Sequence, residues 1–211
     1  METVRERYLR LVSRGGDSDR MVYFSDAIFA IAITLLVLDL PRPSSGDGSA
    51  WDLIVDALPD FFAYALSFVI IALNWLGHHR KFRVIKGHDG PLLWINLGLL
   101  FLVAFVPFPT SLLAEYGGQV PAVVLYAFVV GALSMMQLAI WVYAHRAGLL
   151  DPAVGDAVYR YVVRDLLSTP AVFWASIPIA LLWSGDAAMY FWFALFPVSF
   201  FVGRFGSRKA A

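Results

Sequence analysis

Long hydrophobic blocks separated by short polar segments dominate this chain. A membrane-spanning helix needs about 20 mostly apolar residues. Six segments meet that requirement: 21–40, 57–76, 92–113, 121–144, 166–183 and 187–203. Several contain proline, including Pro59 and Pro107, which we interpret as kinks because neighbouring helices can satisfy the carbonyls that a proline leaves free. The pattern predicts an all-α polytopic membrane protein, a single six-span unit with no second domain.

Composition agrees with a membrane protein. Hydrophobic residues make up 60% of the 211 positions, more than a soluble domain of this length needs. The net charge of zero argues against nucleic acid as a partner. Because the chain has no Cys, disulfides, thiolate nucleophiles and Cys-based metal sites are excluded. No apolar run with a cleavage site precedes the first span, so we expect that span itself to be the insertion signal.

Basic residues gather on one side of the predicted spans. All sixteen except Arg42 fall within four segments, 5–20, 80–86, 146–164 and 204–209. Cytoplasmic segments of membrane proteins carry an excess of Lys and Arg. The sequence therefore predicts that both termini are cytoplasmic.

The opposite side is acidic. Its charged residues, apart from Arg42, are Asp39, Asp47, Asp52, Asp56, Asp60, Glu115 and Asp186. They are either ordinary solvated loop charges or a negative mouth that raises the local concentration of cations. In the second interpretation, Asp39 at the end of the first span belongs to an outer acidic vestibule.

Charged and polar groups open the first span. Arg20, Ser25 and Asp26 lie there, whereas Thr34 is the only polar side chain from 27 to 38. Ionisable groups in a membrane helix are costly and normally have partners. Arg20 and Asp26 are too far apart for a contact along one helix face, although they can still orient the helix at the membrane surface. Candidate partners at similar depth on other spans are Trp75, His78, His79 and Asn96.

One face of the first span is a smooth apolar stripe. At about 100° per residue, Ile31, Leu35 and Leu38 fall within about 60° of each other, and Thr34 borders them. Asp26 lies about 140° from Ile31, on nearly the opposite face. Such a stripe is typical of a surface facing lipid or core, and also of a helix that lines a symmetric pore through hydrophobic rings. Periodicity alone leaves both interpretations open.

The chain carries none of the common enzyme motifs. It has no P-loop, no GxSxG and no HExxH sequence. His78 and His79 are adjacent and point about 100° apart on a helix, so they cannot chelate one metal ion as an i, i+4 pair could. We expect no enzymatic activity, no metal site and no cofactor.

Three sequence motifs resemble those of a known channel family. Arg20, Phe24, Ser25 and Asp26 form an R-x-x-x-F-S-D sequence that continues into an apolar run. It resembles the first-helix signature of the endosomal/lysosomal potassium channel family (transmembrane protein 175 family). WLGHHRKF at 75–82 resembles the end of that family's second helix, and the segment from Asn96 through FVPFPT at 105–110 resembles its third. The second half of the chain agrees only in span number and hydropathy.

The resemblance implies an assembly and a pore. Animal members are similar to two fused six-span copies, whereas bacterial members have one copy and form tetramers. A single copy here implies a homotetramer in the bacterial inner membrane, with helix 1 of each subunit lining the central pore. By position, aliphatic rings at Ile31, Leu35 and Leu38 would replace a carbonyl filter, and Thr34 would add a polar ring. Arg20, Ser25 and Asp26 would belong to a polar network behind the pore.

The implied function is a potassium-permeable cation channel that conducts passively. Potassium would be the permeant ion, and lipid and monovalent cations would be the partners besides the other subunits. A proton-coupled or cation secondary transporter using Asp26 and the histidines is the alternative, although Asp26 is far from the midplane where transporters usually bind. An intramembrane enzyme ranks third because no nucleophile–base set is visible.

Overall fold

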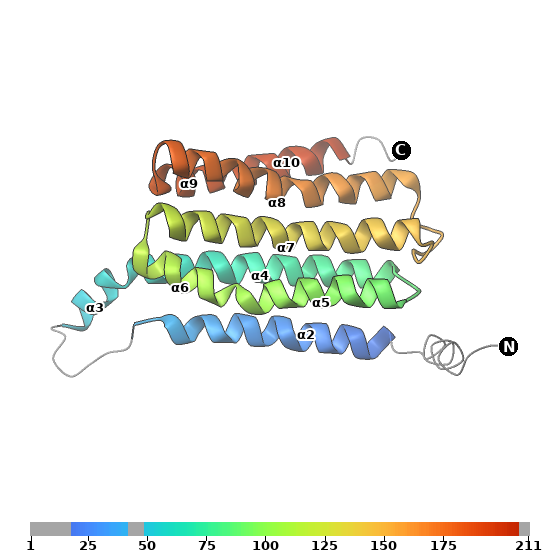
Figure 1. Cartoon of the computed structure of the whole chain (residues 1–211), viewed down its shortest axis with the longest axis horizontal. Coiled ribbons are helices and arrows are strands. Elements are labelled where there is room, and N and C mark those ends of the chain that lie inside the picture. Colours follow the sequence, from blue (N-terminus) through green and yellow to red (C-terminus); the bar gives the residue numbers. More distant parts are fainter. Residues whose placement is uncertain (1–17, 42–48, 207–211) are drawn as a thin grey trace.

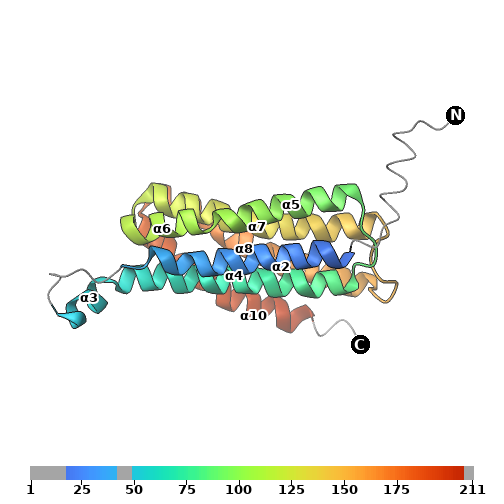
Figure 2. The ribbon, with the colours of Figure 1, turned by 90° about the horizontal axis from the view of Figure 1, so that it is seen from below.

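Long helices running side by side make up the structure, a computed structural model that describes residues 18–41 and 49–206 (Figures 1 and 2). The elements in chain order are α2 (Ser18–Leu35), η1 (Leu36–Asp39), α3 (Ala50–Asp56), α4 (Leu58–Val84), α5 (Gly90–Phe105), α6 (Pro107–Tyr116), α7 (Val120–Arg146), α8 (Asp156–Leu182), α9 (Gly185–Phe191), η2 (Trp192–Ala194) and α10 (Leu195–Gly206).

Five helical stretches in the described part are long and apolar enough to cross a membrane. They are Arg20–Asp39, Leu58–Val84, Gly90–Tyr116, Val120–Arg146 and Asp156–Leu182. They coincide with the first five predicted spans, so the all-helical, multi-span prediction is confirmed at that level.

The predicted sixth span, 187–203, is built differently. It is divided among α9, the 3-10 turn η2 and α10. Pro197 has no backbone N–H to donate to the carbonyl of Phe193, which favours a break in the α-helical pattern at η2. Trp192 in η2 is buried, and its indole donates a hydrogen bond of 2.9 Å to Ser176 Oγ of α8. Whether this segment crosses the membrane stays a prediction.

Two helices are longer than hydropathy indicates. α4 continues to Val84 rather than ending at Leu76, and α8 begins at Asp156 rather than at Leu166. Hydropathy marks only the apolar part of a helix, whereas backbone hydrogen bonds continue into polar turns. In α4 these polar turns also pack inward, because His78 and Lys81 are buried.

Prolines begin helices at two positions where we expected kinks. Pro59 lies in the first turn of α4, and Pro107 begins α6 directly after α5. Pro107 cannot donate to the carbonyl of Val103, which instead accepts from the backbone N–H of Val106 at 3.2 Å. Pro170 does lie inside its helix, α8.

The helix α7 contributes to both hydrophobic clusters of the bundle. One hydrophobic cluster joins it to α2, α4 and α5 and includes Phe29, Ile71 and Leu133. A second cluster joins it to α4, α6, α8 and the α9–η2 segment and includes Tyr126 and Phe173. α7 therefore lies between α2 on one side and α8 with α10 on the other, as Figure 1 shows.

Two connections meet at one end of the bundle. The backbone N–H of Lys86, between α4 and α5, donates to the carbonyl of Leu149, between α7 and α8, at 2.8 Å. Lys86 Nζ lies 3.6 Å from a carboxylate oxygen of Asp151. α2 begins at this same end (Figure 1). Two of the four basic segments therefore share one end, while Arg5, Arg7, Arg10, Arg14, Arg42, Arg208, Lys209 and the acidic Asp47 lie outside the described residues.

The short helix α3 lies at the opposite end, outside the candidate spans. Ser49 and Asp52 form a capping box, in which Ser49 Oγ accepts from the Asp52 N–H at 3.2 Å. The Ser49 hydroxyl donates to the Asp52 carboxylate at 2.7 Å, and the Ser49 backbone N–H donates to it as well. These hydrogen bonds stabilise the ionised carboxylate and lower the pKa of Asp52.

Candidate functional site

The helix α2 buries one face against the bundle. Met21, Ser25, Phe29, Ala32 and Leu36 recur every three or four residues and are all buried. This spacing places them on one side of the helix, where they pack against α4 and α5. No other described element covers the opposite side of α2.

The predicted pore stripe lies on that uncovered side. Ile31, Leu35 and Leu38 are 53%, 42% and 55% exposed. Leu38 belongs to the 3-10 turn η1, where side chains three residues apart are eclipsed, so it stays in line with Leu35. Ile33, in contrast, is half-buried and packs against the hydrophobic cluster. The single chain thus presents the stripe outward; its role as a constriction stays a prediction.

Thr34 is also exposed on this side of the helix. Its hydroxyl donates a hydrogen bond of 2.9 Å to the backbone carbonyl of Ile31, one turn earlier. With the hydrogen used in this way, the oxygen lone pairs of Thr34 remain as acceptors, which is the chemistry that a cation requires.

A chain of buried hydrogen bonds ties α2 to α5 and α4. Asn96 Nδ2 donates to Ser25 Oγ at 3.0 Å, and Ser25 in turn donates to the carbonyl of Met21 at 2.9 Å. This fixes the orientation of the amide, so Asn96 Oδ1 is the acceptor facing His78 Nε2 at 2.9 Å. His78 therefore donates through Nε2, while its Nδ1 is buried without a hydrogen bond. The three side chains are almost completely inaccessible.

Asp26 makes the second link from α2 to α4. The indole Nε1 of Trp75 donates to Asp26 Oδ1 at 2.8 Å. His79 lies beside the indole, with the ring centroids 5.7 Å apart. Both contacts come from the side of α2 that faces the bundle, so Asp26 points away from the exposed stripe.

The remaining two predicted site residues lie near the ends of this helix. Arg20 is exposed in the first turn of α2, and Asp39 is exposed at the last residue of η1. They are therefore at opposite ends of a 20-residue span.

Comparison with known proteins places the chain in a family. A family model described as "Endosomal/lysosomal potassium channel TMEM175" matches residues 20–107. A potassium channel of Streptomyces collinus is 36% identical over 196 residues, which cover 86% of this chain and 95% of that channel. The chain belongs to the TMEM175 family. A potassium channel of Chamaesiphon minutus is 38% identical over 83% of this chain and 93% of its own length.

Structure and more distant relatives agree with membership of the TMEM175 family. The crystal structure of a lysosomal potassium-selective channel TMEM175 homolog from Chamaesiphon minutus matches with a TM-score of 0.72 and 28% identity, covering 91% of this chain. The human endosomal/lysosomal proton channel TMEM175 is 27% identical over 78% of this chain, which spans only 34% of the human protein. With its five apolar helices, this TMEM175 family member is a multi-pass membrane protein.

Sequence reasoning missed a second buried polar cluster in this TMEM175 family member. Ser67 Oγ lies 2.7 Å from Thr110 Oγ1 and 2.9 Å from the Tyr126 hydroxyl. The Thr110 hydroxyl donates its hydrogen to the carbonyl of Val106. Ser67 must therefore donate to Thr110, and the Tyr126 hydroxyl must donate to Ser67. The cluster joins α4, α6 and α7 beside the proline break. In the sequence these hydroxyl groups lie in separate apolar segments, and no pattern predicts that they contact each other.

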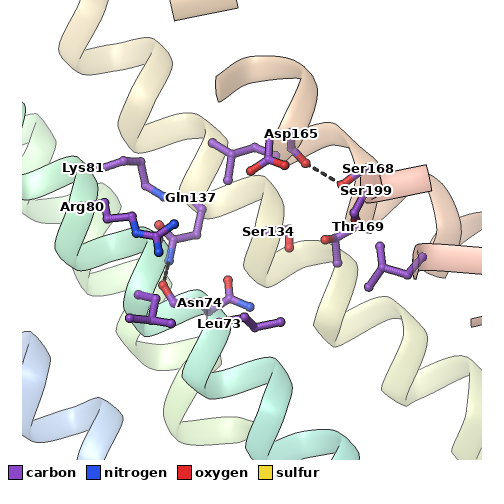
Figure 3. A pocket seen from close by; sticks show the side chains of 14 residues that line it. Leu73, Asn74, Arg80, Lys81, Ser134, Gln137, Asp165, Ser168, Thr169 and Ser199 are labelled. Atoms are coloured by element: carbon purple, nitrogen blue, oxygen red, sulfur yellow. Dashed lines mark hydrogen bonds between the residues drawn. The ribbon is translucent and has the colours of Figure 1, made fainter. Parts of the chain in front are cut away.

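A polar cavity was also missed. It has a volume of about 280 Å³ and lies between α4, α7, α8 and α10 (Figure 3). Its polar lining comes from Asn74, Arg80, Lys81, Ser134, Gln137, Asp165, Ser168, Thr169 and Ser199. The sequence predicts Lys81 to be one of several exposed cytoplasmic charges, and nothing in its sequence context indicates that its side chain is buried.

Proposed function

We propose that this protein is a potassium-permeable cation channel of a bacterial cell membrane. It conducts passively through a hydrophobic constriction built from the first helix of each of four identical subunits. The observation that supports this most strongly is the outward-facing stripe of Ile31, Leu35 and Leu38 on a helix whose other side is fully packed. Membership of a family whose bacterial relatives are named potassium channels supports the permeant ion.

The chemistry of an aliphatic ring explains how such a pore discriminates. Four Ile31 side chains around an axis offer no ligands to a dehydrated ion, so an ion passes largely hydrated or at the cost of losing water. Potassium loses water more easily than sodium, so a narrow apolar ring favours potassium without a fitted cage. The same ring stops conduction by dewetting when it narrows.

The buried hydrogen bonds fix the rotation of α2 about its own axis, and this mechanism requires that rotation to be fixed. A rotation of α2 by one residue position, about 100°, would replace Ile31 at the axis by a neighbour. The Ser25–Asn96–His78 chain resists that rotation because it would leave buried polar groups unpaired. Asp26 and Trp75 add a second constraint one residue further along the helix. In this proposal these residues position the pore helix and do not contact ions.

Four subunits are the second part of the proposal. A single copy of the stripe cannot enclose a pore, and a helix with one bare apolar side needs partners around it. The mass of the detergent-solubilised protein tests this directly by light scattering with detergent correction. Four copies of the 23.4 kDa chain are expected, and a stable monomer in detergents that preserve activity would contradict the assembly.

The alternative, a proton-coupled or cation secondary transporter, would use ionisable groups that line a path through the membrane. Asp26 instead accepts a hydrogen bond from Trp75, and His78 is completely buried. Recording from the purified protein in a planar bilayer separates the two functions. We expect unitary current steps in symmetric potassium without any proton gradient; transport that lacks unitary steps and requires a proton gradient would establish the carrier instead.

A further inference from the structure

The polar cavity between α4, α7, α8 and α10 has the size of a small ligand site. Its volume of about 280 Å³ is far larger than the 10–15 Å³ that one water needs by a comparable measure and is close to the lower end of small-molecule pockets. It lies away from α2 and shares no lining residue with the proposed pore or its polar network.

One wall of this cavity carries a buried cation that has no direct partner among the described residues. Lys81 is only 5% exposed. Among the described residues, its ammonium makes no hydrogen bond and no ion pair within 4 Å, although Asp165 attracts it across the cavity. The side chain folds back along α4, and a Cβ on Gly77 would lie 3.3 Å from Nζ. An ammonium buried in this way is costly unless an anion accompanies it.

Besides the cation, two acceptor groups face this cavity, the side-chain oxygen of Gln137 and the carboxylate of Asp165. Gln137 is 1% exposed, and its Nε2 donates to the carbonyl of Asn74 at 3.0 Å. That bond fixes the orientation of the amide, because a carbonyl can only accept. It leaves Gln137 Oε1 buried and without a hydrogen bond from any described residue. Asp165 presents a carboxylate to the same space, as Figure 3 shows. One ligand that complements all these groups carries an anionic group and a hydrogen-bond donor, and a cationic N–H donor also complements the charge of Asp165.

Taking the middle residue of α4 as the membrane midplane places the Lys81 end of the cavity at the depth of a lipid headgroup. Lys81 follows Ile71, the middle residue of α4, by about 15 Å along the axis at 1.5 Å per residue. Half of a typical hydrocarbon core is also about 15 Å. Leu73 and Leu76 line the cavity and are exposed on the outside of the chain, so acyl chains can continue from it along α4.

We propose that this cavity binds a phosphoethanolamine group. Arg80 and Lys81 hold the phosphate, while Asp165 and Gln137 Oε1 accept from the primary ammonium. The group can come from a membrane phosphatidylethanolamine or from a free phosphomonoester. This assignment does not depend on the proposed channel function.

Thermal unfolding of the full-length, delipidated protein in detergent tests this site. The probes are short-chain phosphatidylethanolamine, short-chain phosphatidylcholine and phosphoethanolamine, and binding to the folded state raises the unfolding midpoint. We expect the ethanolamine lipid to bind on the order of tenfold more tightly than the choline lipid, whose quaternary ammonium has no N–H to donate. A response to phosphoethanolamine equal to that of the lipid identifies a soluble ligand, whereas a response to the lipid alone identifies a membrane ligand.

Three variants test whether the shift in unfolding midpoint comes from binding in this cavity. Lys81→Met should abolish the response to every probe, whereas Arg83→Gln removes a neighbouring exposed cation that does not line the cavity and should leave the response intact. Asp165→Asn should keep binding but remove the preference for ethanolamine over choline. Equal responses in the parent protein and in Lys81→Met, or no preference for ethanolamine in the parent protein, would overturn the proposal. If Lys81→Met does not fold, the preference in Asp165→Asn still decides.

Discussion

At the scale of single residues, hydrogen bonds from α2 explain why charge and amide groups lie inside an apolar bundle. Asp26 accepts from Trp75 of α4, and Ser25 accepts from Asn96 of α5, so these two polar side chains of α2 each have a partner on a neighbouring helix. Removing one partner leaves the other buried and incompletely paired, which costs more than the bond itself contributes.

Replacing Trp75 by Phe tests this arrangement, because it removes the N–H donor to Asp26 and keeps an aromatic side chain, although a smaller one. We expect a destabilisation of about 1.5–3 kcal/mol, because the acceptor is a carboxylate and the smaller ring fills less of the space against the hydrophobic cluster. Thermal unfolding in detergent measures it. The control is Trp94→Phe on α5, where the indole is 75% exposed and little change is expected. An altered ion preference in Trp75→Phe without loss of stability would indicate that Asp26 contributes to the ion path and does not serve to position the helix.

Depth along the spans was sufficient to name these partners from the sequence. Trp75, His78 and Asn96 were candidates because they lie at the same membrane level as Ser25 and Asp26. Lys81 could not be assigned in the same way. Its neighbours Arg80 and Arg83 suggest one more exposed cytoplasmic charge. Lys81 is nevertheless buried, at a place where α4 packs against α7.

At the scale of elements, close packing of α7 against α8 fixes the part of the bundle that faces away from α2. Gly131 of α7 lies against the indole of Trp174 in α8, and a Cβ at this position would overlap that ring. Trp174 Nε1 also lies 3.4 Å from the carbonyl of Phe128. Small residues permit this kind of approach between membrane helices.

Gly131→Ala should therefore destabilise the protein by about 1–3 kcal/mol through overpacking. Gly98→Ala in α5 is the matched control, because the nearest atom to its Cβ would be Met136 Sδ at an ordinary 3.5 Å. The control should be neutral or stabilising, since Ala favours a helix over Gly. Thermal unfolding of the two variants compares them, and equal effects would mean that α7 and α8 are not packed this closely.

The 3-10 turn η1 ends the first span with an exposed carboxylate, Asp39. If it contributes to a negative outer mouth, Asp39→Asn should lower inward cation current at 0.01 M salt, where the Debye length is about 30 Å, and much less at 1 M, where it is about 3 Å. Asp156→Asn, exposed at the start of α8 at the other end of the bundle, is the control. Equal loss of current at both salt concentrations would indicate direct ion binding by Asp39.

The ends of the helices are the part of the fold that the sequence pattern predicts least well. Hydropathy located five spans, but it ended α4 too early because polar side chains such as His78 are buried by tertiary contacts. It also does not show that the residues after Val106 form a separate helix, α6, although α5 and α6 together remain one candidate span, Gly90–Tyr116. These differences come from packing partners far away in the sequence, which a local pattern does not contain.

At the scale of the whole molecule, charge predicts how the bundle is inserted. The connections around Lys86 and Asp151 meet at one end, whereas α3 lies at the other (Figure 1). The excess of basic residues predicts that the Lys86 end is cytoplasmic.

Cysteine labelling tests this orientation, since the native chain has no Cys. A membrane-impermeant maleimide applied to intact spheroplasts should label Trp51→Cys, an exposed position in α3. It should label Lys86→Cys only after the membrane is permeabilised. Labelling of Lys86→Cys in intact spheroplasts would reverse the proposed topology.

The central claim is that the stripe on α2 forms the selective constriction, and bi-ionic reversal potentials test it most directly. Shortening Ile31 to Ala should widen the narrowest ring, admit water and raise sodium permeability relative to potassium. Ile33→Ala is the control, because Ile33 packs toward the bundle and not along the stripe; its reversal potential should stay close to that of the parent protein. A shift in Ile33→Ala with none in Ile31→Ala would contradict the account.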